Sequence, residues 1–133
     1  MEPVLEFKSV SKTLGKGVAA QKVLTDVSLD LFQGDIAAII GPSGSGKSTL
    51  LSLAGLLNTP DAGEIRLNGT RISNQTKSIA AKHRRLDFGY VFQHFNLIPV
   101  LSALENIELS LHCLLYTSPS PRDLSTSRMP SSA

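Results

Sequence analysis

A glycine-rich segment at residues 41–48 constrains the fold of this chain more than any other feature of its sequence. The segment reads G-P-S-G-S-G-K-S, which fits the pattern G-x-x-x-x-G-K-[S/T] of a phosphate-binding loop. It follows a continuous apolar run at residues 36–40 and precedes a leucine-rich stretch at residues 50–57. We expect a strand covered on both faces, then a tight loop, then a helix. That order is typical of an α/β fold.

The residue types in this loop suit the binding of a triphosphate. Glycine lacks a Cβ atom, so the backbone at Gly41, Gly44 and Gly46 can approach phosphate oxygens closely. Backbone N–H groups at the start of the following helix would point at the anion. The ammonium of Lys47 would contact the β- and γ-phosphates, and the hydroxyl of Ser48 would bind Mg²⁺. The alternative is a glycine-rich turn with an exposed lysine. A turn of that kind gives no reason for a strand directly before it and a helix directly after it.

Other patterns predict further elements on both sides of the loop. They are strands at residues 4–10, 27–31 and 88–92, a hairpin at residues 64–72, a partly helical segment at residues 73–85, and a helix from Ser102 to about Leu111. The hairpin turns at Asn68 and Gly69, which supply the positive φ that its turn needs. Ser102 and Glu105 form a capping box at the start of the last helix.

Composition and charge exclude several classes of protein. The chain has 13 Lys and Arg against 11 Asp and Glu, a formal charge of +2. That balance excludes dependence on a strongly basic nucleic-acid surface, so we expect no nucleic-acid partner. No apolar run approaches the ~18 residues of a membrane helix, and the N-terminus lacks the pattern of a secretory signal. One cysteine excludes an internal disulfide framework.

The composition changes near residue 112, because all ten glycines precede it while residues 113–133 are rich in serine and proline. One interpretation is a disordered tail or linker. The other is a translated sequencing-library adaptor, whose two fixed ends residues 113–123 and 127–133 resemble. We favour the adaptor, and expect the genome to diverge from this reading frame near codon 113. We therefore divide the chain into a domain at residues 1–112 and a non-native tail at residues 113–133.

Taken with the loop, residues 90–99 make the chain resemble the nucleotide-binding domains of ABC transporters. This segment reads Y-V-F-Q-H-F-N-L-I-P, and residues 23–29 resemble the second strand of the family. Residues 101–109 resemble the branch concerned with lipoprotein release, macrolide export and cell division. The resemblance covers residues 4–111. It implies the N-terminal part of an ABC-type P-loop NTPase, with an antiparallel β-subdomain and an incomplete parallel core sheet.

The resemblance also assigns roles to the residues that match the motifs of the family. It identifies residues 41–48 as the Walker A loop and Gln93 as the Q-loop glutamine, which in the family reaches Mg²⁺ and the attacking water. The implied cofactors are ATP and Mg²⁺. The implied nucleotide-binding residues are Gly41, Pro42, Ser43, Gly44, Ser45, Gly46, Lys47, Ser48 and Thr49. Ser48 and Gln93 are the implied metal ligands, and Lys47 and Gln93 have supporting catalytic roles.

Two departures from the family pattern affect these expectations. Leu14 stands where the family usually has an aromatic residue that stacks on adenine, so we expect weaker or purely apolar contact with the base. The signature motif, the Walker B aspartate, the catalytic glutamate and the switch histidine are missing after Gln93. Residues 124–127 begin like the signature motif but lack its glycines. We therefore expect an N-terminal fragment that is hydrolytically inactive.

For the parent protein, the resemblance implies the ATP-hydrolysing subunit of a bacterial ABC system for export or lipoprotein release. It would form a homodimer around two ATP molecules, peripheral at the cytoplasmic face of the plasma membrane through a permease subunit. The alternatives are the ATPase of an importer, a soluble ABC protein, a non-catalytic regulatory fragment made by the cell or, more remotely, a P-loop kinase. Gln93 and the residues that follow it argue against the kinase. The transported substrate depends on permease surfaces.

Overall fold

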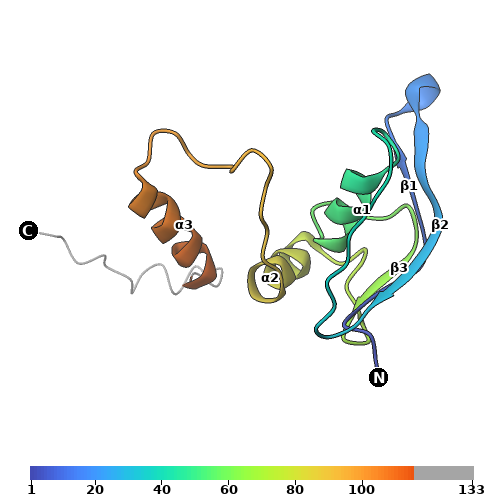
Figure 1. The fold of residues 1–133 in the computed structure, drawn as a ribbon, viewed down its shortest axis with the longest axis horizontal. Helices are drawn as coiled ribbons and strands as arrows, with labels where there is room; N and C mark the ends of the chain where they lie inside the picture. The colour runs from blue at the N-terminus through green and yellow to red at the C-terminus, as the bar shows by residue number, and fades with distance from the viewer. Residues whose placement is uncertain (116–133) are drawn as a thin grey trace, which may run out of the picture. The chain divides into compact units, whose positions relative to one another are not determined.

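The structure is a computed structural model that describes residues 1–115, with only the backbone described for residues 113–115. It divides into two compact units, Met1–Tyr90 and the residues from Val91 onward (Figure 1). Beyond residue 115, the predicted non-native tail lies outside the described residues.

The first unit is built on an antiparallel sheet with the strand order β2-β1-β3-β4. Its strands are β1 (Leu5–Leu14), β2 (Gln21–Leu31), β3 (Ala62–Leu67) and β4 (Thr70–Arg71). A short 3-10 helix, η1 (Gly17–Ala19), connects β1 to β2. The strands predicted at residues 4–10 and 27–31 are confirmed, and both are longer than predicted. They are longer because the two strands pair with each other by hydrogen bonds, and this pairing continues to Leu14 and Gln21.

The predicted hairpin is also confirmed, because β3 and β4 pair across a turn at Asn68 and Gly69. Both turn residues have positive φ, 47° and 75°. Glycine adopts this conformation without strain and asparagine tolerates it, so the dipeptide itself specifies the turn.

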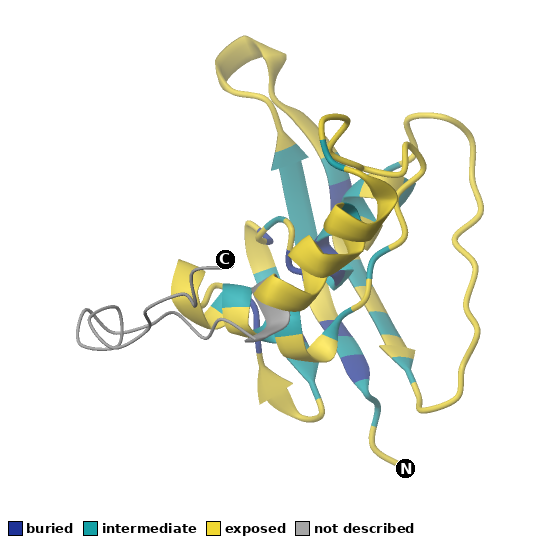
Figure 2. Ribbon diagram, turned by 90° about the vertical axis from the view of Figure 1, so that its left-hand side faces the viewer, coloured by how far each residue is buried: buried dark blue, intermediate teal, exposed yellow. Residues whose placement is uncertain are grey.

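The core of the first unit lies between one face of the sheet and helix α1 (Lys47–Ala54). Phe7 and Val10 of β1, Ile65 of β3 and Leu53 of α1 are almost completely buried there. Figure 2 shows buried positions, in dark blue, on the strands of the sheet. The leucines of residues 50–57 do not all share this burial, because Leu51 is 60% exposed.

Two predicted strands are absent from the described residues, which corrects the sequence analysis. Residues 36–40 and 88–92 have no regular structure, and Ile36, Ile40 and Val91 are exposed. A strand is held by hydrogen bonds to a neighbouring strand, and no segment within residues 1–115 pairs with either one. The expected antiparallel β-subdomain is therefore formed, whereas the parallel core sheet is not formed by this part of the chain.

Helix α2 (Lys77–Asp87) confirms the predicted helical content of residues 73–85. Thr76 caps it, since its Oγ1 accepts a hydrogen bond from the Ile79 N–H at 3.3 Å. In the last turn of the helix, Arg84 reaches the segment after α1 and donates to the Leu56 carbonyl at 2.9 Å. Helix α2 is thereby tied to the same unit as the phosphate loop.

The second unit contains α3 (Ala103–Leu115), whose predicted capping box is confirmed. The Glu105 N–H donates to Ser102 Oγ at 3.2 Å, and the Ser102 N–H donates to Glu105 Oε2 at 2.7 Å. These bonds stabilise the carboxylate, so the pKa of Glu105 is lowered. The helix runs past the predicted end at Leu111.

Within residues 1–115, no helix has both the length and the apolar character needed to span a bilayer.

Candidate phosphate-binding site

Residues 41–46 form a tight loop that leads directly into α1. Gly44 and Gly46 have φ values of 80° and 93°, in the left-handed region that favours glycine. Gly46 has a second reason to lack a side chain, because a Cβ atom there would lie 2.8 Å from the Val23 carbonyl oxygen. The loop is therefore packed directly against β2.

The Lys47 side chain folds back over this loop. Its Nζ donates to the carbonyl oxygens of Gly41 and Pro42, at 2.6 and 2.7 Å, and lies 3.4 Å from Ser45 Oγ. These contacts hold the first part of the loop around a positive charge. Gly41, Pro42 and Ser45 therefore contribute to the site by holding the lysine side chain in place.

The start of α1 is free of the groups that would compete with an anion. Gly46 is its N-cap and provides no side-chain hydrogen bond, and the first turn contains no acidic residue. The first N–H groups of a helix have no partner within the helix, and here they include those of Lys47 and Ser48. Together with the helix dipole, these donors suit phosphate oxygens.

The hydroxyl of Ser48, in the first turn of α1, fits the predicted role of a Mg²⁺ ligand. Mg²⁺ prefers oxygen ligands and usually binds through one or two protein groups together with substrate phosphates. No cluster of three or more His, Cys, Asp or Glu residues occurs in the described part of the chain. The donor set therefore fits a Mg²⁺ ion that is brought with a phosphate group, rather than a metal site made by protein alone.

A hollow of about 350 Å³ opens in front of the loop. It is lined by Leu14, Gln21, Val23, Ser43, Gly44, Gly46, Lys47, Ser48 and Thr49. The structure thus brings Leu14 together with the predicted nucleotide-binding residues of the loop. Sequence reasoning missed Gln21 and Val23. Their place beside the loop follows from the close approach of Gly46 to Val23, which no local residue pattern indicates.

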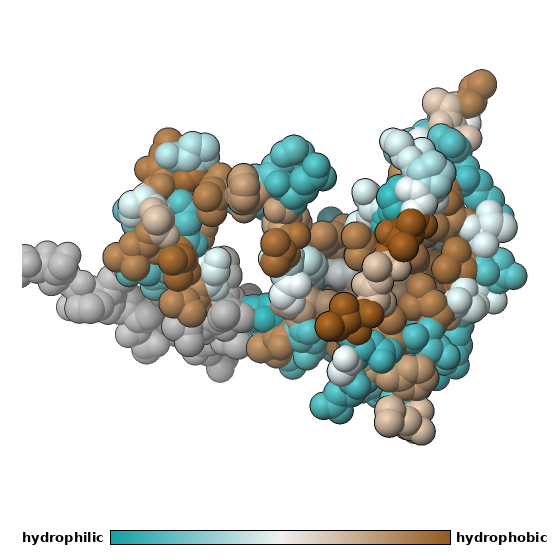
Figure 3. All heavy atoms as spheres, in the orientation of Figure 1, coloured by the Kyte–Doolittle hydropathy of each residue, from teal (hydrophilic) through white to brown (hydrophobic). Residues whose placement is uncertain are grey.

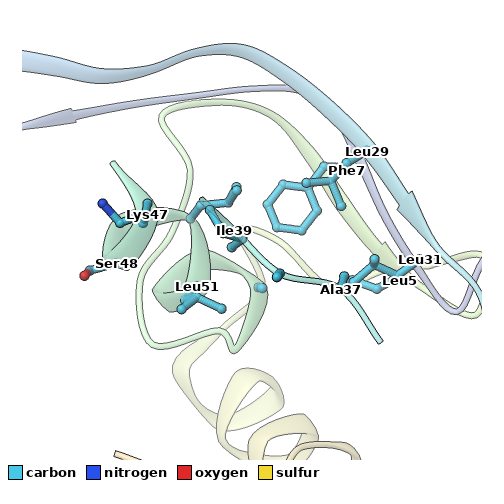
Figure 4. A pocket seen from close by; sticks show the side chains of 12 residues that line it. Leu5, Phe7, Leu29, Leu31, Ala37, Ile39, Lys47, Ser48 and Leu51 are labelled. Carbon is cyan, nitrogen blue, oxygen red and sulfur yellow. The ribbon is translucent and has the colours of Figure 1, made fainter. Parts of the chain in front are cut away.

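A second, apolar hollow of about 550 Å³ lies behind the loop, between the sheet and α1 (Figure 4). Phe7 and Leu29 line it from the sheet, Ile39 lines it from the irregular segment, and Leu51 lines it from the helix. Its polar lining comes from Lys47 and Ser48, at the start of α1. It lacks a set of polar groups of its own that could orient a ligand.

Gln93 lies in the second unit, in an exposed turn closed by a hydrogen bond from the Phe95 N–H to the Phe92 carbonyl at 3.2 Å. Phe95 and Asn96 have positive φ there, 56° and 54°. The phosphate loop belongs to the first unit, so the role of Gln93 as a ligand of Mg²⁺ stays a prediction.

Asn106 is a structural residue of the second unit that sequence reasoning missed. Its amide nitrogen donates to the carbonyl oxygens of Leu101 and Ser102, at 3.2 and 2.9 Å, and its amide oxygen accepts from the Ile98 N–H at 2.8 Å. The side chain thus fixes the segment between the Gln93 turn and α3. An asparagine in the first turns of a helix, next to a capping box, was the available clue.

Comparisons with known proteins agree with this geometry. The family described as "ABC transporter" matches residues 24–131. The macrolide export ATP-binding/permease protein MacB of Marinobacter nauticus is 42% identical over 107 residues, which cover 80% of this chain and 17% of MacB. The ABC transporter ATP-binding protein MJ1508 of Methanocaldococcus jannaschii is 44% identical over 108 residues, 81% of this chain and 48% of the relative.

Among solved structures, the chain is similar to the ATP-binding cassette MJ0796 in a dimeric, post-hydrolysis state bound to ADP and Pi. The TM-score is 0.78 at 39% sequence identity, and the likeness covers 89% of this chain and 51% of that one. The chain therefore spans about half of the length of the separate cassettes and about a sixth of MacB. The family match extends beyond residue 112, and the division of the chain at that residue stays a prediction.

Proposed function

Because this chain belongs to the ABC transporter family, we propose that residues 41–49 bind the triphosphate of Mg-ATP. The observation that carries the proposal is the position of the Lys47 ammonium, held inside a glycine loop at the uncapped start of α1. The cassette MJ0796, solved with ADP and Pi, supports it. The fold of that cassette agrees with the ABC ATPase fold expected from the sequence.

In the proposed complex, Lys47 exchanges its carbonyl partners for oxygens of the β- and γ-phosphates. Both sets of partners accept hydrogen bonds from the ammonium, but the phosphates are charged and the carbonyls of Gly41 and Pro42 are not. Hydrogen bonds between two charged groups are shorter and stronger, so the exchange favours binding. The Ser48 hydroxyl would hold the accompanying Mg²⁺, and the role of Gln93 as a further ligand stays a prediction from the family motif.

We extend the proposal to the whole protein as the ATP-hydrolysing subunit of a transport system for export or lipoprotein release. MacB is described as an ATP-binding/permease protein, and the structure of MJ0796 is dimeric. By analogy, the parent of this chain forms a homodimer and acts on a membrane permease. It would then be peripheral to the cytoplasmic face of the membrane.

The test is the binding of Mg-ATP and of inorganic triphosphate with Mg²⁺ to the 133-residue chain, measured by isothermal titration calorimetry. Lys47→Ala removes the charge inside the loop and is expected to weaken both ligands at least about tenfold, the effect of losing a charged hydrogen bond. Lys82→Ala is the matched control, because it removes an equally charged side chain from an exposed position on α2. Circular dichroism checks that each variant folds. Unchanged ATP affinity in Lys47→Ala would contradict the proposal.

A further inference from the structure

The helix that carries the candidate phosphate site is too short to be stable by itself. α1 has eight residues, of which Leu53 is the buried one, and its N-cap Gly46 gives no side-chain hydrogen bond. Isolated helices shorter than about 12 residues are marginal in water. Burial stabilises α1 only in part, since Leu51 is 60% exposed and Figure 3 shows apolar side chains, in brown, on the surface of this unit. The geometry of α1 therefore depends on other contacts within the first unit.

Two side chains from far along the sequence cap the end of α1 that is opposite the phosphate loop. The Tyr90 hydroxyl donates a hydrogen bond to the carbonyl of Gly55, the C-cap residue, and Arg84 Nη1 donates to the Leu56 carbonyl at 2.9 Å. The last carbonyls of a helix have no partner within the helix, so these donors satisfy them. A guanidinium charge at this end also interacts favourably with the helix dipole.

The contact between Tyr90 and Gly55 is shaped on both partners. A Cβ atom on Gly55 would lie 2.6 Å from Tyr90 Cε1, so the missing side chain lets the ring lie against the helix end. Gly55 has a φ of −87°, which any residue can adopt, and the close approach of the ring therefore accounts for the glycine. The ring also stacks near Phe88, with 6.3 Å between the ring centroids. Burial raises the pKa of the Tyr90 phenol, although the charge of Arg84 lowers it, so near neutral pH the hydroxyl keeps the proton that it donates.

α1 connects this capped end to the phosphate loop through its own backbone. The Leu50 N–H donates to the Gly46 carbonyl at 2.8 Å, and the Gly55 N–H donates to the Leu51 carbonyl at 3.0 Å. Bonds of this kind span four residues each, and eight residues of helix are about 12 Å long. Over so short a length, a change in the direction or fraying of one end changes the position of the other.

We propose that Tyr90 is a positioning residue for phosphate binding, which acts through α1. Its bond to the Gly55 carbonyl holds the far end of the helix, and the first turn with Lys47 and Ser48 is thereby held in the orientation that receives the phosphates. The coupling is reciprocal, so an anion at the start of α1 strengthens the bond between Tyr90 and Gly55. This inference rests on the proposed binding of the triphosphate by the loop.

The first experiment removes the Tyr90 hydroxyl and keeps the ring. Tyr90→Phe in the 133-residue chain is expected to weaken inorganic triphosphate with Mg²⁺ about 2- to 10-fold in calorimetry, at most the value of one hydrogen bond. Ser73→Ala is the matched control, because it removes a hydroxyl that accepts a hydrogen bond from the Ile65 N–H in the sheet of the same unit. We expect both variants to lower the urea midpoint and only Tyr90→Phe to weaken triphosphate.

Gly55→Ala disturbs the same contact from the helix side. The added Cβ displaces the Tyr90 ring, and we expect triphosphate to weaken by a similar factor. Gly89→Ala is its control, because a Cβ atom there would meet no atom within 4 Å. The double variant of Tyr90→Phe and Gly55→Ala should lose less affinity than the two single losses combined, because both changes act on one contact.

Tyrosine fluorescence provides a readout that a purely structural role would not change. The chain has two tyrosines and no tryptophan, so in a Tyr116→Phe background the emission comes from Tyr90. Emission of a phenol responds to the hydrogen bond that its hydroxyl donates. We expect triphosphate with Mg²⁺ to change this emission with the same Kd as in calorimetry. In the same background, Lys47→Ala should move the change to a concentration at least about tenfold higher.

Three results would overturn the positioning role of Tyr90. They are an unchanged triphosphate affinity in Tyr90→Phe, an equal loss in Ser73→Ala, or an emission of Tyr90 that stays constant at saturating triphosphate. If Tyr90→Phe does not fold, an unchanged affinity in Gly55→Ala overturns it. In each case, triphosphate binding that depends on Lys47 leaves the proposed function intact. If no triphosphate binds to the parent chain, both proposals fall.

Discussion

Residues 62–67 and 36–40 of the first unit are both short segments that contain apolar residues, but only the first is a strand. Ile65 of β3 is fully buried, whereas Ile40 is 92% exposed. In sequence, the second segment has the more continuous apolar run. The difference is that β1 lies beside β3, while no described segment pairs with residues 36–40. A pairing partner, and not apolar content, therefore decides which segment forms a strand.

The largest expected effect contrasts Phe7→Ala in the sheet with Ile40→Ala in the unpaired segment. Phe7 is 1% exposed, and its truncation should lower the free energy of unfolding by about 3–5 kcal/mol. Ile40 is almost fully exposed, so its truncation should change stability by at most about 0.5 kcal/mol. Urea denaturation followed by circular dichroism measures both. A comparable loss in Ile40→Ala would mean that this segment is buried in solution, and the contrast would be broken.

A smaller effect on stability is expected from a buried hydrogen bond between β3 and the segment that follows β4. Ser73 is 2% exposed, and its Oγ accepts a hydrogen bond from the Ile65 N–H at 3.0 Å. Ser73→Ala leaves this N–H without its side-chain partner and should cost about 1–3 kcal/mol. Ser78→Ala, at an exposed position in α2, is the control. Equal midpoints for the two variants would show that this bond does not stabilise the sheet.

The smallest effect is a pH dependence at the entrance to β3. The Asp61 carboxylate accepts hydrogen bonds from the Thr13 N–H at 2.7 Å and from Lys12 Nζ at 3.1 Å. The Thr13 N–H, followed by Lys12, lowers the pKa of Asp61 in the folded state. Its contribution to stability is therefore complete above the usual aspartate value, about pH 4, and is lost as the pH falls through the lowered pKa.

Asp61→Asn should flatten this acidic part of the stability curve, measured by denaturation between about pH 2 and pH 6. The change should be small because the carboxylate is at the surface, where solvent screens it. Glu2→Gln is the reference variant, an exposed carboxylate near the N-terminus. An identical curve for Asp61→Asn and the parent chain would show that this carboxylate does not hold β1 to β3.

Local patterns accounted for much of the fold and for part of the candidate site. The Asn68–Gly69 turn, the capping box of Ser102 and Glu105, and the order of loop and α1 were all predicted, and the structure contains them. Gln21 was not predicted as part of the hollow. Its place there depends on its pairing with Leu14 and on the bulges within the β1–β2 pair, which the residue pattern does not predict.

The sequence by itself determined the features that a few neighbouring residues can enforce. Positive φ at Gly44 and Gly46, the caps of the helices and the family membership follow from short motifs, because backbone sterics and short-range hydrogen bonds act within several residues. Only the tertiary structure decided which apolar segments are buried and which side chains share the hollow with Lys47. Those outcomes depend on hydrogen bonds and packing between residues far apart in the chain. An apolar segment becomes a strand only where another strand lies beside it to accept and donate the backbone hydrogen bonds.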